Sequence, residues 1–266
     1  MPKVFLTGLI LAVVFVTSAL PIFANEALSA EQIIRKAIVQ SQLSEESLEA
    51  TGYTFTKTTK REQFDENGRI QDRTHRLHEI LFKSGSLLQK RVPSAGESSV
   101  EAKKIENEEA KVAAQRSRNK ISTRGEFLKI LTPELVGRYD FRLVRKVNLK
   151  GRPAFELAFQ PKGEKLPNKG LADRVLNQAT GTIWIDVEEF EVAKAQIHLD
   201  KEILVGGGLI GCLKRAAFIL ERDRLPGGIW FDRSTKADYE ARRLLASIRV
   251  ITKSESRNFR VLSSEG

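Results

Sequence analysis

The sequence is poor in cysteine, since Cys212 is the single one in 266 residues. One cysteine cannot form an intrachain disulfide, so a hydrophobic core has to stabilise the fold. Cys212 also lies in an apolar stretch with no histidine near it in the sequence. This spacing argues against a cysteine–histidine nucleophile.

Histidine is scarce as well, and the three histidines lack the spacing of a metal site. His75 and His78 lie three residues apart in an extended segment, where such side chains point to opposite faces, and His198 lies in another segment. The sequence contains no Cys₂His₂, H-E-x-x-H or G-x-S-x-G pattern. Its carboxylates fall at turn and helix-face positions. We therefore expect no catalytic residues, no metal, no cofactor and no enzymatic activity.

A glycine-rich stretch over residues 206–211, GGGLIG, formally matches G-x-G-x-x-G. That pattern binds dinucleotides in the strand-to-helix turn of a βαβ unit, whereas extended segments flank it here on both sides. The favoured interpretation is an apolar hairpin loop. The candidates for contact with a membrane or a partner protein are Leu204, Val205, Leu209 and Ile210.

An uncharged apolar run, VFLTGLILAVVFVTSALPIFA, follows Lys3. Pro21 breaks this run, and Ala24 supplies the small residue that a secretory cleavage site needs. We predict a signal peptide over residues 1–24 and a single periplasmic domain over residues 25–266, soluble after cleavage. An uncleaved N-terminal helix is the alternative, because the run approaches the length of a membrane span. No cysteine follows Ala24 to carry a lipid anchor.

The charge is unbalanced, with 44 basic against 34 acidic residues and a net charge of +10. In an exported protein this balance favours lipid head groups, membrane surfaces or acidic proteins as partners, and we expect no nucleic acid. A merely solvated basic surface is the other interpretation.

The first element after the apolar run is a helix over about residues 29–49. Ser29 and Gln32 form a capping-box pattern, and the apolar residues that follow share one helical face: Ile33, Ile34, Ala37 and Ile38.

Extended segments begin at Tyr53 and continue to the end of the chain with one interruption. Asn67-Gly68 lies between two of them and predicts a hairpin in which both turn residues have positive φ. From Tyr139 onwards, turn signals recur about every dozen residues, and the helical crossovers that parallel strands would need are absent; one connection is a polar loop at 162–179. The pattern predicts an antiparallel sheet.

The interruption is a predicted helical insertion at about residues 94–135. Residues 94–124 are charged and have a thin apolar stripe, as in a solvent-exposed helix, although a mobile lid is an alternative. A short apolar helix, expected to end at Pro133, follows them.

Two tryptophan segments, GTIWID and GGIWFD, are built alike. We expect the Gly-x-Ile-Trp motifs that end at Trp184 and Trp230 each to begin a strand, and Asp186 and Asp232 to close it by accepting hydrogen bonds from turn amides.

Large apolar residues alternate with small or polar ones in two neighbouring segments. Such faces are normally core, but a strongly curved sheet can leave an apolar pocket on its concave side. The candidates for lining a ligand cavity are Phe155, Leu157, Phe159, Ile183 and Ile185.

The order of these elements, with FRLVRKVNLKGRPAFELAFQPK at 141–162 and GTIWIDVEEFEVAKAQI at 181–197, resembles the LolA/LolB-like lipoprotein-carrier superfamily over most of residues 29–262. The resemblance implies an α+β fold: a strongly curved antiparallel β-sheet, or incomplete β-barrel, with an N-terminal helix and a helical insertion covering the open side. It also implies a cavity for lipoprotein acyl chains and a part in outer-membrane biogenesis. No position matches a specific ligand-contacting residue of that superfamily.

The leading hypothesis is therefore a periplasmic, non-enzymatic binding or carrier protein for a lipid or lipid-modified protein, whose acyl chains occupy an apolar cavity of the curved sheet. The alternative is an envelope protein-interaction or stress-sensor module with a self-filled core. Lipid or lipoprotein acyl chains are the expected partners, and a membrane surface or another envelope protein would be further ones.

Overall fold

The computed structural model describes residues 28–50, 52–83, 86–93, 103, 107, 131–163, 166–168, 170–199, 201–205, 211–243 and 246–262. Its strands are β1 (Tyr53–Phe64), β2 (Ile70–Lys83), β3 (Ser86–Val92), β4 (Tyr139–Leu149), β5 (Arg152–Pro161), β6 (Ala179–Asp186), β7 (Val192–Leu199), β8 (Ile203–Val205), β9 (Gly211–Arg224), β10 (Trp230–Arg243) and β11 (Ala246–Val261). Its helices are α1 (Ala30–Ala50), α3 (Pro133–Val136) and α4 (Leu171–Leu176). The predicted signal peptide, most of the predicted insertion, Leu209 and Ile210 lie outside the described residues.

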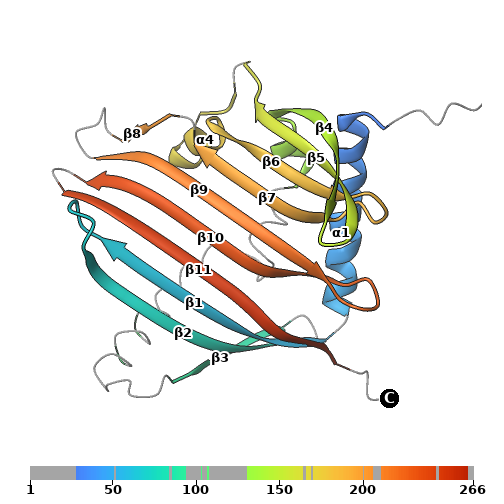
Figure 1. Ribbon diagram of the computed structural model, residues 1–266, viewed down its shortest axis with the longest axis horizontal. Coiled ribbons are helices and arrows are strands. Elements are labelled where there is room, and N and C mark those ends of the chain that lie inside the picture. The colour runs from blue at the N-terminus through green and yellow to red at the C-terminus, as the bar shows by residue number, and fades with distance from the viewer. Residues whose placement is uncertain are drawn as a thin grey trace, which may run out of the picture.

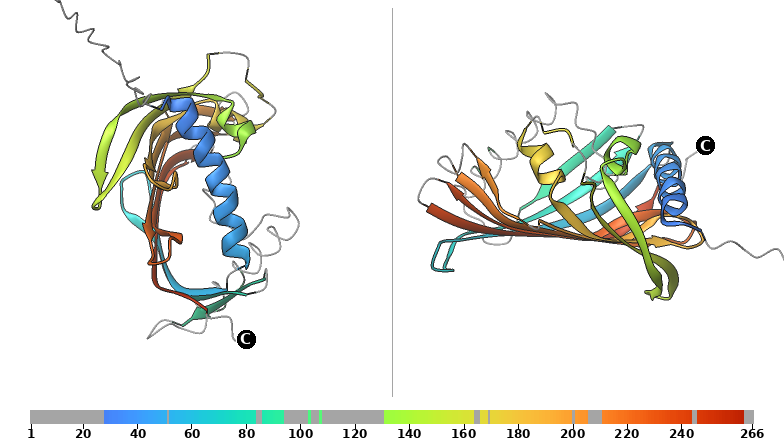
Figure 2. Two further views of the ribbon diagram at one scale, coloured as in Figure 1. Left: turned by 90° about the vertical axis from the view of Figure 1, so that its right-hand side faces the viewer. Right: turned by 90° about the horizontal axis from the view of Figure 1, so that it is seen from above.

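The eleven strands form one sheet in the order β3-β2-β1-β11-β10-β9-β7-β6-β5-β4, with β8 paired to β9 (Figure 1). Every pairing is antiparallel. The sheet bends into a C, and α1 lies across its open side (Figure 2). The predicted curved, open antiparallel sheet with an N-terminal helix is thus confirmed. We call the side that faces α1 the concave side.

Helix α1 begins with the predicted capping box. The Gln32 amide donates to Ser29 Oγ, and the Ser29 amide donates to Gln32 Oε1, at 3.2 and 2.8 Å. Its apolar stripe is buried against the sheet: Ile33, Ile34, Ala37 and Ile38. Two turns further on, Ser41 and Ser44 replace the isoleucines on this stripe. Ser41 is buried, and the Ser44 hydroxyl donates to the Glu191 carboxylate in the turn between β6 and β7.

The core cluster joins this stripe to the concave side of β5, β6, β7 and β9. Its members from the sheet are Phe155, Leu157, Ile183, Ile185, Val192, Ala195 and Leu220. Burial of these side chains is the main force that holds α1 on the sheet, at about 1.5–3 kcal/mol for each large aliphatic side chain.

The β1–β2 and β4–β5 turns form where the sequence predicts them, but the backbone of the first differs from the expected one. Residues 65–69 form the predicted β1–β2 hairpin, but only Gly68 has a positive φ, of 75°. Asp65 explains this, because its Oδ1 accepts the amides of Asn67 and Arg69 and closes a longer loop than the two-residue turn we expected. The β4–β5 turn has positive φ at both Lys150 and Gly151, as a two-residue hairpin requires.

Three other expectations were wrong. Pro133 begins α3 instead of ending a helix, because proline lacks an N–H and suits the first helical turn. The loop at 162–179 contains the short helix α4. Asp232 lies inside β10, at a bulge, so only Asp186 closes its strand, where Oδ1 accepts the amides of Glu188 and Glu189.

No helix in the described part of the chain has the length and apolarity needed to span a membrane.

Candidate functional site

The concave side is organised in rows of residues that lie directly opposite one another on neighbouring strands. The inner row lies under α1 and runs from β4 to β2: Leu143, Leu157, Ile183, Ala195, Leu220, Thr235, Ser254, Thr59 and Arg76. Residues facing each other in this way share one face of the sheet. From β5 to β9 the inner row is almost completely buried.

The outer row lies one pleat further from α1, two residues along each strand. It contains Phe141, Phe159, Gly181, Ile197, Phe218, Ala237, Thr252, Arg61 and Thr74. Phe141, Ile197 and Phe218 pack against the core cluster, and these three side chains and Phe159 are only partly buried. From β4 to β9 the outer row is therefore an apolar surface that α1 leaves partly uncovered.

Gly181 has no room for a side chain in the outer row. A Cβ at this position would lie 2.0 Å from the Gln196 carbonyl oxygen and 3.0 Å from the tip of the Phe159 ring. The missing side chain therefore leaves room for the Phe159 ring beside β6, and the centroid of that ring lies 6.0 Å from the centroid of the Phe141 ring on β4.

The structure separates the five cavity candidates into two groups. Phe155, Leu157, Ile183 and Ile185 belong to the core cluster under α1, where Leu157 and Ile185 are 0% exposed. Phe159 alone lies on the partly uncovered outer row. The curvature does produce an apolar concave face, but α1 fills the part of it that four of these residues line.

Sequence reasoning missed Phe141, Ile197 and Phe218 as members of the same surface. Alternation was a visible signal, because Ile197 follows Ala195 and Phe218 precedes Leu220 by two residues. The sequence did not predict that these residues form one row. The row depends on the pairing of β7 with β9, which skips β8, and no local pattern indicates that pairing.

Of the four loop candidates, the structure describes Leu204 and Val205, both in β8. The Leu204 side chain is 43% exposed, and its carbonyl accepts a hydrogen bond of 2.6 Å from Arg174 Nη1 on α4. Val205 is half-buried and pairs with Gly211.

A buried ion pair lies between the C-terminal half of α1 and the sheet. Arg222 Nη1 donates to Glu191 Oε2 at 2.7 Å, and both side chains are 1% exposed. Glu191 also accepts a hydrogen bond from the hydroxyl of Ser44 on α1. Arg222 further donates to the carbonyls of Val192 and Trp230, at 3.2 and 3.1 Å. These contacts join α1, β7, β9 and β10 through polar groups.

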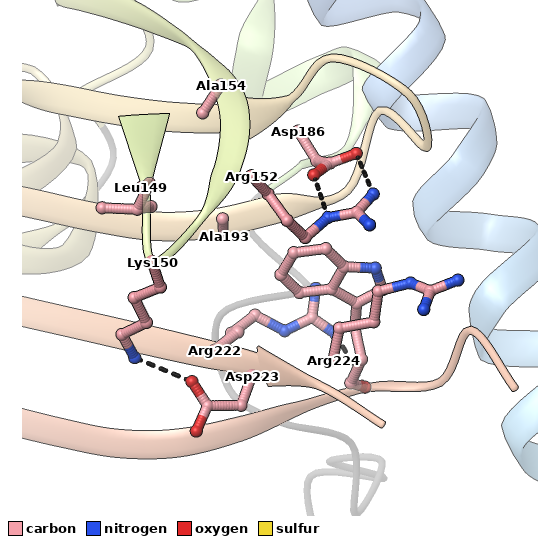
Figure 3. A pocket seen from close by; sticks show the side chains of 10 residues that line it. Leu149, Lys150, Arg152, Ala154, Asp186, Ala193, Arg222, Asp223 and Arg224 are labelled. Atoms are coloured by element: carbon pink, nitrogen blue, oxygen red, sulfur yellow. Dashed lines mark hydrogen bonds and ion pairs between the residues drawn. The ribbon is translucent and has the colours of Figure 1, made fainter. Parts of the chain in front are cut away.

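A pocket of about 250 Å³ lies beneath the tip of the β4–β5 hairpin (Figure 3). The hairpin tip projects from the side of the sheet away from α1 (Figure 2). Arg152 holds Asp186 by two hydrogen bonds of 2.7 and 2.9 Å, and Lys150 reaches Asp223 on β9 at 2.7 Å. The Arg152 guanidinium also stacks on the Trp230 ring at 5.9 Å.

Glu189 extends this charged network around the pocket. It accepts hydrogen bonds from Arg224 and from the Trp230 indole, both of which line the pocket, and its Oε2 lies 3.8 Å from Arg152. The hydrogen bond from Arg224 is the main reason that the pKa of Glu189 is lowered. Every charged side chain named here pairs with an opposite charge, so the network is best explained as the fastening of the hairpin tip to β9 and β10.

The histidines lie apart, with His78 buried and His75 exposed on the other face of β2. Among the described residues, no group of three His, Cys, Asp or Glu side chains is arranged to hold a metal ion.

Comparison with known proteins finds similar folds but no sequence relatives. No protein-family model matches the chain, and no curated protein matches it. Among solved structures, a DUF1329 family protein from Desulfovibrio piger ATCC 29098 aligns with a TM-score of 0.36 and 11% identity over 88% of this chain and 95% of that one. A LolA superfamily protein from Nitrosomonas europaea aligns with a TM-score of 0.31 and 11% identity, over 88% and 94%.

MucB from the Pseudomonas aeruginosa MucA/MucB complex also aligns, with a TM-score of 0.28 and 11% identity over 88% of this chain and 99% of that one. One of these solved structures is named as a LolA superfamily protein, the superfamily that the order of sequence elements resembles. With TM-scores below 0.5 these alignments support no further argument, and the chemistry of the concave side is derived from this chain's own residues.

Proposed function

We propose that the protein is a non-enzymatic, periplasmic binding or carrier protein that holds an acyl chain against the outer row. The observation that supports this proposal is the contrast between the two rows. Helix α1 covers the inner row from β5 to β9, whereas Phe141, Phe159, Ile197 and Phe218 on the outer row are only partly buried. An apolar surface that the described part of the chain leaves partly uncovered is a common mark of a ligand or partner site.

The outer row has suitable dimensions for such a ligand. Phe141 on β4 and Phe218 on β9 are four strands apart, which corresponds to about 19 Å because neighbouring strands lie ~4.8 Å apart. The chains of one bilayer leaflet occupy about 15 Å, half of the ~30 Å hydrocarbon core. One extended acyl chain would therefore find apolar contacts along its whole length.

Replacing Phe218 by Gln tests this site. Loss of an aromatic contact worth about 1.5–3 kcal/mol should weaken binding of hexadecanol roughly tenfold or more, measured by displacement of a hydrophobic dye. The fold should survive, because Phe218 is only partly buried. Native mass spectrometry of the purified wild-type protein should also detect a bound acyl ligand.

Phe64→Gln is the matched control, because the Phe64 ring lies 6.0 Å from the Arg249 guanidinium, on the side of the sheet away from the rows. It should leave hexadecanol binding unchanged. Equal binding by wild type and Phe218→Gln would contradict the outer-row site.

A specific observation also supports the second candidate, an envelope protein-interaction or sensor module. The concave side under α1 is packed with the protein's own side chains, as a self-filled core requires. In that case, native mass spectrometry would detect no acyl ligand, and neither Phe218→Gln nor Phe64→Gln would change dye binding.

The proposed location has its own test. If residues 1–24 are a cleaved signal peptide, N-terminal sequencing of the protein from a periplasmic extract should begin at Asn25. Recovery of a chain that begins at Met1 in the membrane fraction would instead support the uncleaved helix.

A further inference from the structure

Three lysines lie in register on the side of the sheet away from α1. Lys60 on β1, Lys253 on β11 and Lys236 on β10 lie directly opposite one another on neighbouring strands, and all three side chains are exposed. Each is the chain neighbour of a residue of the inner row, so its side chain points to the opposite face of the sheet. We call these three residues the lysine row.

A row of equal charges is unfavourable for the fold itself. The Cβ atoms of directly opposite residues lie about 4.5–5.5 Å apart, and like charges in such pairs destabilise a sheet. Among the described residues, no carboxylate oxygen lies within 4.0 Å of an Nζ atom of the lysine row. A feature that costs stability and forms no ion pair in the described part of the chain is best explained by a function.

The acids nearest to the lysine row are already bound to arginines. On β1, β11 and β10, each carboxylate in the two adjacent rows accepts a hydrogen bond of 2.9 Å or less: Glu62 from Arg73, Glu255 from Arg257, and Asp238 from Arg249. Lys60 helps to lower the pKa of Glu255, and Lys236 that of Asp238, but the hydrogen bond from arginine is the largest cause in both. Three lysines and three arginines thus face three carboxylates, which leaves an excess of positive charge.

The type and the place of these cations favour a broad anionic surface as the partner. Arginine suits directional, bidentate contacts, and the arginines next to the row are engaged, whereas the cations left over are lysines, which act as flexible point charges. Strands β10 and β11 lie in the back of the C, on the side that α1 does not cover (Figure 2). The lysine row also does not line the pocket beneath the β4–β5 hairpin tip.

We infer that the lysine row docks the protein on an anionic membrane surface, by charge and reversibly, with the concave side turned away from the bilayer. This inference goes beyond the proposed acyl site and does not depend on it. Each lysine near such a surface should contribute about fivefold in affinity at low salt. Docking in this orientation would leave the outer row open to the aqueous phase.

The test measures binding of the full chain to vesicles of phosphatidylcholine alone and of equal parts phosphatidylcholine and phosphatidylglycerol. The readout is the ratio of the two affinities, because the apolar run at 4–24 would act on both vesicles alike. Wild type should prefer the anionic vesicles and lose this preference near ~1 M salt, where the screening length falls to ~3 Å. Replacing Lys60, Lys236 and Lys253 by Gln should reduce the preference by about fivefold per lysine. The melting temperature should not fall, because like-charge pairs are removed.

The control removes three other exposed lysines by the changes Lys36→Gln, Lys57→Gln and Lys201→Gln. Lys36 lies on α1, Lys57 on the concave side of β1, and Lys201 just before β8, so the net charge changes equally while the lysine row stays intact. The control should keep most of the preference. Equal losses in the two triple variants, or a wild type without preference, would overturn the inference. Salt-sensitive binding to immobilised polyglutamate without binding to vesicles would also overturn it, in favour of an acidic protein. Each of these results leaves the acyl site to its own test with hexadecanol.

Discussion

Leu157→Glu is expected to prevent folding. Leu157 is 0% exposed and lies in the inner row between Leu143 and Ile183, in the core cluster that contains the isoleucines of α1. A glutamate here would bury a carboxylate among apolar side chains with no cation in the cluster to pair with it. Circular dichroism should show loss of the native β spectrum. The milder Leu157→Ala should fold but lose about 2–5 kcal/mol of unfolding free energy.

Ala158→Glu is the matched control, one residue along β5 and on the opposite face. Ala158 is only half-buried and lies opposite the exposed Arg142 on β4, so a glutamate there has both water and a cation within reach. Its melting temperature should stay within a few degrees of wild type. A folded Leu157→Glu protein with a native spectrum would show that Leu157 lines an open cavity, as the sequence pattern alone allowed.

The different positions of Leu157 and Phe159 show how far alternation can predict a site. Alternation correctly places Phe155, Leu157 and Phe159 on one face of β5, because the period of a strand is fixed by its backbone. It cannot tell which of them a helix from a distant part of the chain will cover. That depends on where α1 crosses the sheet, and α1 covers Leu157 but leaves Phe159 on the partly exposed row.

Local signals predicted local structure well. The capping box at Ser29 and the turn at Asp186 both form as expected, because each involves groups within three residues of one another. The helix α4 was missed because its six residues are too few to show a helical period. The second tryptophan segment does not end its strand at Asp232 as expected, because β10 continues past a bulge between Asp232 and Ser234.

The apolar part of the outer row had no sequence signal as one surface. Phe141, Ile197 and Phe218 lie far apart in the chain and meet only through the order β9-β7-β6-β5-β4. Strand order of this kind is set by the whole topology, so a site that depends on it appears only in the structure.

Arg222→Met is expected to be strongly destabilising, by about 3–5 kcal/mol, because it leaves the Glu191 carboxylate buried without its cation. Among the described residues, Glu191 would keep only the Ser44 hydroxyl as a partner, the carbonyls of Val192 and Trp230 would lose a donor, and Asp232 would lose its ion pair with Arg222. Chemical denaturation should therefore show a lower midpoint with an unchanged slope.

Two further variants identify the cause. The double variant Arg222→Met with Glu191→Gln should recover part of the loss, because a neutral amide costs less to bury than an unpaired carboxylate. Arg249→Met breaks another two-hydrogen-bond pair, with Asp238 at 2.9 and 2.6 Å, but Arg249 is 39% exposed, so its loss should cost no more than about 1 kcal/mol. Similar losses in Arg222→Met and Arg249→Met would mean that water reaches Glu191, and that α1 is held to the sheet by its isoleucines alone.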